Sequence, residues 1–548
     1  MISCLSNAAR ANVSIKVACR LRTEYLASLH RSPTMSSVTL TVSRPNLRNF
    51  PGLLAMLAIF AIVLSLWRLG AAADGVLVTT TALAGTPVTV YRAATAQPAP
   101  VVVIAHGFAG SQQLMQSFAL TFARNGYIAV TFDFPGHGRN GRPLTGSLTE
   151  IDGATRTLVA SVAEVARYAR GLGDGRLAVL GHSMATDIVI RYANATPGVA
   201  ATIAVSMFSP AVTSSAPRNL LVIVGDWEGT LKREGLRAVS LATAPAAAQP
   251  FMTYGDPATG TGRRIAFSAH VEHASVLYSV DSLREALGWL DATFGRERAR
   301  APAVESRGQW ILLLVAGVVL LANPLAAWLP QVAAPALGAS LSWRHLWLPL
   351  LGPMIATPLL LRPIPTNFLP VAVADYLVVH FALYGALTFL GMAWMRRGSD
   401  APAAQALSLP AFVRAAAASS AFVAIALAWP IDTFVTSFFP GEGRFFLLLA
   451  MLVGTLAFFL NDEWLTRGPG AARGAYLASK IAFLVSIAVA VLLDFQRLFF
   501  LVLIVPVMLL FFMIGGLFSG WIYRATGHPF VAGIVNAILF AWAIGVTF

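Results

Sequence analysis

Long apolar segments follow one another through the C-terminal half of the chain. An α-helix needs about 20 mainly apolar residues to cross the hydrocarbon core of a bilayer. Only 12% of the residues are charged, whereas soluble domains carry about 25%. We therefore expect an all-α bundle of about eight transmembrane helices within residues 309–548. The apolar segments lie at about 310–329, 346–361, 368–394, 415–429, 445–460, 481–493, 498–518 and 530–548.

Two further segments make up the first 70 residues. Residues 1–48 hold one acid, Glu24, against seven Lys and Arg, without sustained apolar periodicity, and predict a disordered basic leader. Residues 49–70 contain the run PGLLAMLAIFAIVLSLWRL, which is long enough for a transmembrane anchor. The small residues AAADG that follow leave a cleaved signal peptide as the alternative. Both cysteines, Cys4 and Cys19, lie in the leader, so we expect neither a disulfide framework nor a cysteine metal site in the folded body.

Residues 77–294 have a different character. Short apolar runs alternate here with amphipathic stretches and glycine-rich turns, which is typical of βαβ units around a mostly parallel sheet. One α/β domain, a mostly parallel sheet flanked by helices, is therefore predicted over 77–294, followed by a proline- and charge-bearing linker over 295–308. The runs expected as buried strands are VVVIA (101–105), YIAVTF (127–132), LAVL (177–180), ATIAV (201–205) and LLVIV (220–224).

The run LAVLGHSMATDIVI (177–190) combines a short strand, a turn and a helix around Ser183. Its centre, GHSMA, resembles the G-x-S-x-G elbow of the α/β-hydrolase superfamily, in which a nucleophilic serine occupies a tight strand-to-helix turn. Small residues flank such a serine because strand and helix backbones approach closely there. Here Ala185 stands in place of the last glycine. The resemblance implies an α/β-hydrolase fold with Ser183 as nucleophile.

Two upstream segments resemble the same superfamily. The strand VVVIA leads into HGFAGS (106–111), which resembles the oxyanion loop after the third strand of that fold. The resemblance implies that the backbone amides of Phe108 and Met184 bind the negative oxygen of the tetrahedral intermediate. The segment DFPGHG (133–138) looks like the D-x-x-G-x-G turn, which has a structural role.

In this fold the catalytic residues follow one another along the chain as Ser, acid and His. The acid and the histidine are therefore expected downstream of Ser183, in that order. In LLVIVGDWEGT (220–230), two carboxylates follow an expected strand. The resemblance implies the superfamily's G-x-x-acid spacing, which selects Glu228 when counted from Gly225, and Asp226 is the alternative. Further on, RRIAFSAHVEHASVLYS (263–279) offers two histidines. We expect His273 to be the base because it directly precedes the final helical run, and His270 is the alternative.

These residues together predict a Ser-His-acid triad. His273 takes the proton of Ser183 as the hydroxyl attacks a carbonyl carbon, and Glu228 orients the imidazole and stabilises the imidazolium. Water then releases the acyl-enzyme. We expect this chemistry to need no metal and no organic cofactor.

The net charge of +14 is spread over loops beside apolar segments and forms no nucleic-acid-binding stripe.

The basic residues of the loops predict the orientation of the chain in the membrane. With the anchor running from inside to outside, the inward loops hold eight basic residues and the outward loops three, so the positive-inside rule places the α/β domain outside the cytoplasm. Arg68 and the cluster within 296–307 oppose this orientation. We expect a multi-pass protein of the inner (cytoplasmic) membrane of a bacterium, with the lipid bilayer as partner. The inward residues are Arg344, Arg396, Arg397, Arg414, Arg467, Arg473, Lys480 and Arg524, and the outward ones are Arg362, Arg444 and Arg497.

A charged motif interrupts the predicted bundle. Asp462-Glu463 followed by Arg467 resembles the E-E-x-x-x-R motif of the bacterial CaaX-protease-like membrane family. That family carries a histidine about where Asn536 stands in this chain, and no F-x-x-x-H is present, so a protease site is incomplete. We interpret the three charged residues as a cytoplasmic turn.

The sequence thus favours a membrane-integrated serine hydrolase of esterase, lipase or peptidase type. Its substrate is an ester, thioester or amide that is either a small molecule or lipophilic. One alternative is a catalytically silent hydrolase-fold module that regulates a transporter-like or scaffold membrane domain. A second is an intramembrane protease with the α/β domain as accessory.

Overall fold

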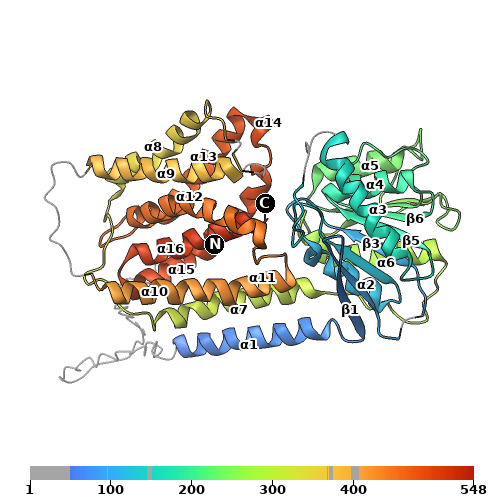
Figure 1. Cartoon of the computed structure of the whole chain (residues 1–548), viewed down its shortest axis with the longest axis horizontal. Coiled ribbons are helices and arrows are strands. Elements are labelled where there is room, and N and C mark those ends of the chain that lie inside the picture. Colours follow the sequence, from blue (N-terminus) through green and yellow to red (C-terminus); the bar gives the residue numbers. More distant parts are fainter. Residues whose placement is uncertain are drawn as a thin grey trace, which may run out of the picture. The chain divides into compact units, whose positions relative to one another are not determined.

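A computed structural model of the chain describes residues 50–95, 97–144, 151–366, 368–369, 374–395 and 407–547. The leader predicted for residues 1–48 lies outside these residues, as do Arg396 and Arg397. The described part begins with one apolar helix, continues with an α/β domain and ends with a long helical region (Figure 1).

The α/β domain is built on a nine-stranded sheet in the order β1-β2-β4-β3-β5-β6-β7-β9-β8. The strands from β4 to β9 in this order run parallel, whereas β1, β2 and β8 pair antiparallel. This mostly parallel sheet confirms the predicted α/β-hydrolase fold. The strands are β1 (Val76–Leu83), β2 (Thr86–Ala93), β3 (Val101–Ala105), β4 (Ile128–Phe132), β5 (Leu177–His182), β6 (Val199–Val205), β7 (Leu220–Gly225), β8 (Thr253–Tyr254) and β9 (Arg263–Ser268).

Helices cover both faces of the sheet because its central strands are apolar on both. In β3, Val102 and Ile104 belong to an apolar cluster with α2 and α6, whereas the alternate residues of the strand belong to a cluster with α3 and α4. Helix α5 packs on the same face as α4, against β7. The carboxyl ends of the parallel strands therefore meet at one edge, where this class of fold places its sites. The helices are α2 (Gln116–Arg124), α3 (Arg156–Arg170), α4 (Met184–Ala195), α5 (Gly229–Ser240) and α6 (Val280–Phe294).

Eight described helical stretches are long and apolar enough to cross a membrane, by length and composition. One of them, α1, coincides with the predicted anchor, and the other seven lie beyond residue 306. The segment expected at 346–361 forms a helix, α8 (Trp343–Leu361), but three prolines and the polar residues Arg344 and His345 lower its mean hydropathy, and it is not among the eight. The helices that contain the eight stretches are α1 (Phe50–Ala71), α7 (Arg307–Ala326), α9 (Ala374–Met395), α10 with α11 (Leu409–Phe434), α12 (Glu442–Thr466), α13 (Ala475–Leu493), α15 (Leu501–Thr526) and α16 (Pro529–Thr547).

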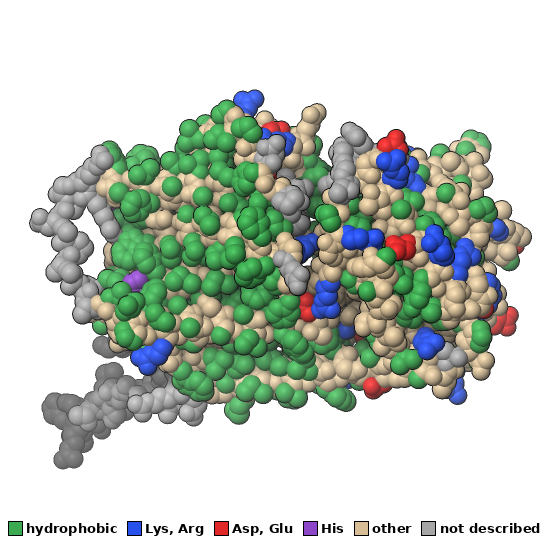
Figure 2. Space-filling model, viewed as in Figure 1, with side chains coloured by type: hydrophobic (Ala, Val, Ile, Leu, Met, Phe, Trp, Pro, Cys, Tyr) green, Lys and Arg blue, Asp and Glu red, His purple; other side chains and the backbone are tan. Residues whose placement is uncertain are grey.

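The surfaces of the two regions differ in character. On the face shown in Figure 2, hydrophobic side chains cover much of the helical region, whereas most Lys, Arg, Asp and Glu lie on the α/β domain. Such a broad exposed apolar surface is costly in water and is suited to lipid. Large side chains exposed on the helices include Phe60, Leu312, Phe389, Val453 and Leu492.

Short connections attach the α/β domain to its flanking helices. Only four residues separate the end of α1 from the start of β1. On the other side, the Glu305 amide donates to Thr121 Oγ1 at 3.1 Å. Arg307, in the first turn of α7, donates to Gln116 Oε1 at 2.6 Å. Both ends of the domain are thus held close to a helix long enough to span a bilayer.

Candidate active site

Ser183 occupies the turn between β5 and α4. Its φ of 54° and ψ of −120° lie in a region that residues with a side chain rarely adopt. Gly181 permits the turn, because a Cβ there would lie 2.5 Å from the carbonyl oxygen of Ala185. The small residues of GHSMA therefore serve a close approach of strand and helix, and Ala185 fits, fully buried, at the last position.

His273 lies between Ser183 and Glu228. Its Nε2 is 2.8 Å from Ser183 Oγ, and its Nδ1 is 2.6 Å from Glu228 Oε1. Both are hydrogen-bond distances. Ser183 follows β5, Glu228 follows β7 and His273 follows β9, so the ends of three parallel strands at one edge of the sheet supply the three side chains.

Two donors hold the second oxygen of the Glu228 carboxylate. Ser206 Oγ and the Gly225 amide each donate to Glu228 Oε2 over 2.7 Å. The Glu228 side chain is only 5% exposed, so its charge is oriented by hydrogen bonds with little solvent nearby. Ser206 is not among the residues predicted from the sequence. The available signal is its place directly after β6, at the edge of the sheet that carries Ser183.

The two alternative residues lie apart from this arrangement. Asp226 pairs with Lys232 at 2.6 Å, and the hydrogen bond from Lys232 lowers the pKa of the Asp226 carboxyl. His270 is exposed on a turn with a φ of 57°. Of these two histidines, it is His273 that bonds to Ser183 Oγ and Glu228 Oε1 within the described part of the chain.

The loop after β3 lies against the turn that carries Ser183. A Cβ at Gly107 would be 2.9 Å from Ser183 Cβ, so this approach depends on a glycine. Phe108 is the next residue of the loop. Met184 is the first residue of α4, where backbone amides lack an acceptor within the helix. The two residues expected to stabilise an oxyanion thus belong to the two segments that meet beside Ser183.

Two buried histidines support the site. His106 Nε2 accepts a hydrogen bond from the Phe134 amide at 3.1 Å, and its Nδ1 donates to the Gly107 carbonyl at 2.8 Å. Burial lowers the pKa of His106 to about 4, which keeps the ring neutral and able to make both bonds. His182 Nε2 lies 2.9 Å from the carbonyl oxygen of His273, and burial lowers its pKa to about 3. The neutral His182 ring therefore donates to the backbone of His273 and positions it.

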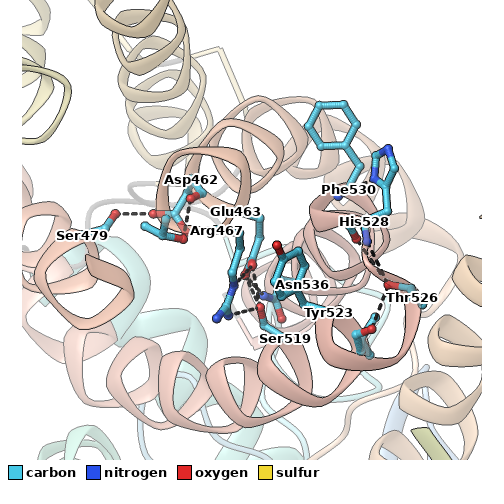
Figure 3. A network of polar contacts seen from close by, with 12 residues as sticks. Asp462, Glu463, Arg467, Ser479, Ser519, Tyr523, Thr526, His528, Phe530 and Asn536 are labelled. Atoms are coloured by element: carbon cyan, nitrogen blue, oxygen red, sulfur yellow. Dashed lines mark hydrogen bonds and ion pairs between the residues drawn. The ribbon is translucent and has the colours of Figure 1, made fainter. Parts of the chain in front are cut away.

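The charged motif of the helical region is buried, so the expectation of a cytoplasmic turn is wrong. Asp462 and Glu463 lie near the end of α12 and are 2% and 0% exposed. Helix α12 continues through Asp462 and Glu463 because each buried carboxylate has charged or hydrogen-bonding partners, which include residues of α13, α15 and α16 (Figure 3). Glu463 contacts Arg467 (3.1 Å), Ser519 (2.6 Å) and Asn536 (3.1 Å), and Asp462 contacts Ser479 and Lys480.

Comparison with known proteins assigns the α/β domain to a class. The family model described as serine aminopeptidase, S33, matches residues 96–243, a stretch that contains Ser183 and Glu228 but ends before His273. With the strand order of the sheet, this match identifies an α/β-hydrolase domain in the chain. No curated protein matches the chain.

Several solved hydrolase structures are similar to the chain. A CIB-like hydrolase from Thermoplasma acidophilum is 16% identical, with 40% of this chain and 97% of that chain covered and a TM-score of 0.31. An epoxide hydrolase from Vigna radiata is 21% identical, with 27% and 41% covered and a TM-score of 0.20. A bacterial membrane phospholipase A is 15% identical, with 46% and 94% covered and a TM-score of 0.27.

The acid can be tested with a matched pair of isosteric substitutions. Glu228→Gln should lower kcat on a chromogenic ester by about 10³-fold or more, because His273 loses the anionic partner that stabilises its protonated form. Asp226→Asn should leave kcat within about twofold, because Asp226 contacts Lys232 instead. A larger loss in Asp226→Asn than in Glu228→Gln would reverse the assignment.

The base can be tested in the same assay with the two histidines. We expect His273→Ala to lower kcat by about 10⁴-fold or more, since members of a triad act as a unit. His270→Ala should retain nearly full activity, because its side chain is exposed and away from Ser183. An inactive His270→Ala protein beside an active His273→Ala protein would contradict the geometry described above.

Proposed function

We propose that this chain is a membrane-integrated serine hydrolase that cleaves an ester, thioester or amide bond through an acyl-enzyme. The observation that carries the proposal is the hydrogen-bonded series Ser183, His273 and Glu228 on a strained strand-to-helix turn. A serine alone after a glycine is an ordinary turn residue. A serine within 2.8 Å of an imidazole that a buried carboxylate orients is an activated nucleophile.

The proposed reaction has two steps. Ser183 Oγ attacks the substrate carbonyl carbon while His273 Nε2 takes its proton, and the proton then passes to the leaving group as the bond to that group breaks. The amides of Phe108 and Met184 stabilise the oxyanion. In the second step His273 takes a proton from water, the resulting hydroxide attacks the acyl carbon, and the acid product leaves as Ser183 Oγ recovers the proton from His273. Glu228 stays ionised and stabilises the imidazolium in both steps.

We infer a structural role for the buried charges of the helical region rather than a second catalytic site. Glu463 is neutralised by Arg467 and Asp462 by Lys480, so each carboxylate already has its partner. Among the described residues, no group of three or more His, Cys, Asp or Glu could hold a metal ion. The likeness to the CaaX-protease-like family therefore suggests at most a shared scaffold.

We propose that the α/β domain lies on the outer, periplasmic or extracellular, face of a bacterial inner membrane. Of the eight inward basic residues, Arg467 and Lys480 are paired with buried carboxylates, and the other six, against three outward, favour this orientation. The opposing cluster at 296–307 is in part bound to the domain itself. Arg298 pairs with Asp291 at 2.5 Å, and Arg296 donates to the Gly126 carbonyl at 2.7 Å. Arginines held in this way contribute less to the charge balance of a loop at the membrane surface.

A fluorophosphonate probe tests the proposed activity directly, because it reacts with activated serines. We expect rapid labelling of the purified protein and none in Ser183→Ala, together with loss of ester hydrolysis to the uncatalysed level. A folded protein that is never labelled would contradict the proposal and favour the silent regulatory module. Labelling that persists in Ser183→Ala would place the nucleophile elsewhere.

Orientation can be tested with single cysteines in a chain whose Cys4 and Cys19 are replaced by serine. Ala258→Cys lies on the exposed surface of the α/β domain, and Pro469→Cys lies in the exposed loop between α12 and α13. In spheroplasts, a membrane-impermeant maleimide should modify Ala258→Cys at once and Pro469→Cys only after permeabilisation. The reverse pattern would mean that the enzyme meets cytosolic substrates.

A further inference from the structure

The edge of the sheet that carries the triad contacts α11 (Ala428–Phe434) and the loop that follows it. After β3, Ser111 Oγ lies 3.0 Å from Thr436 Oγ1, and Gln113 Nε2 donates to the Asp432 carbonyl at 3.2 Å. After β4, Arg139 pairs with the Asp432 carboxylate at 2.5 Å. Strand β3 is the direct neighbour of β5, which leads into Ser183. The loops beside the nucleophile therefore rest on the ends of helices that are apolar enough to span a bilayer.

A short aromatic segment, FQRLFF at residues 495–500, joins α13 to α15 and begins with the one-turn helix α14 (Phe495–Leu498). Two of its rings, Phe495 and Phe499, are 57% and 43% exposed. The third, Phe500, lies 4.9 Å from the ring of Phe108, measured between centroids. Exposed rings without a polar atom, next to helices apolar enough to span a bilayer, are suited to lipid rather than water. An apolar surface therefore extends from the ends of these helices to the loop that flanks Ser183.

Two more large apolar side chains are exposed at the same edge of the sheet. Phe208 follows β6, and Trp227 follows β7; they are 65% and 66% exposed. The Phe208 amide contacts Thr186 Oγ1, three residues beyond Ser183, and Trp227 directly precedes Glu228. Exposed apolar groups around a catalytic edge favour an apolar substrate over a charged, water-soluble one.

We propose that the substrate is an acyl lipid of the bilayer, whose acyl chain reaches Ser183 from the membrane past Phe500 and Phe108. The proposal rests on the serine hydrolase function above and adds the class of substrate and its route. Ser183 takes the acyl group as the bond between the acyl carbonyl and the lipid breaks, and the released lipid alcohol, thiol or amine takes the proton from His273. Water then hydrolyses the acyl-serine, and a free fatty acid is the second product.

The short connections of the domain are consistent with this route. Four residues between α1 and β1, and the contact of Arg307 with Gln116 at the start of α7, hold the domain at the level where the spanning helices end. The acyl carbonyls of bilayer lipids lie in that interfacial layer. The lipid therefore does not have to leave the membrane for its carbonyl to meet the nucleophile.

The test compares two fluorophosphonates with the full-length protein in phosphatidylcholine vesicles. One carries a hexadecyl chain and partitions into the bilayer; the other carries a short, water-soluble chain. Both react with the same serine, so the ratio of their labelling rates reports access and not chemistry. Phe500→Ser is the test variant. Phe495→Ser is the matched control, because Phe495 lies in the same segment and packs on Phe499 rather than on Phe108.

We expect the bilayer-embedded probe to label the unmodified protein about tenfold faster than the soluble one, and Phe500→Ser to lower this ratio at least about fivefold. Phe495→Ser should keep the original ratio. Poor folding of a variant lowers both rates together and leaves the ratio intact. Labelling by the soluble probe alone, or an unchanged ratio in a Phe500→Ser protein whose rate with the soluble probe is undiminished, would overturn the membrane route while sparing the hydrolase. Absence of labelling by both probes would overturn the hydrolase itself.

Discussion

The close approach of β5 and α4 at Gly181 sets the geometry on which the site depends. It forces Ser183 into a backbone conformation that costs about 1–3 kcal/mol, and such strain persists only where the surroundings fix it. Here β5 is fully buried between β3 and β6, and the Ser183 amide donates to the Val205 carbonyl at 2.9 Å. The turn therefore holds Ser183 Oγ beside His273 without help from the substrate, which is the preorganisation that nucleophilic catalysis needs.

The fold was predictable where physical signals are local. The runs 101–105, 127–132, 177–180, 201–205 and 220–224 are continuous and apolar, because strands covered on both faces need no polar residues, and they correspond to β3–β7. The hairpin of β1 and β2 is not among the predicted strands. Strand β1 is an exposed edge of threonine and valine, so no burial pattern marks it. The turn around Ser183 was recognisable because the close approach of strand and helix requires small residues, here Gly181 and Ala185.

Contacts between distant segments could not be predicted in this way. Ser206 donates to Glu228 from another strand, and a single serine after a strand carries no signal of its partner. Asp462 and Glu463 suggested a solvated turn because isolated charges are costly in an apolar setting. Their partners Lys480 and Asn536 come from other helices, and only the packed structure brings them together. The same holds for Asp432, which pairs with Arg139 across nearly 300 residues.

The central claim is that Ser183 forms a covalent acyl intermediate at the membrane surface. The most direct measurement is intact and peptide mass spectrometry of the vesicle-bound protein, quenched in acid during turnover of a long-chain acyl ester. The account predicts a mass increase equal to one acyl group, located on the peptide that contains Ser183 and absent in Ser183→Ala. Product formation without any acylated protein, or an acyl group on a different residue, would contradict it.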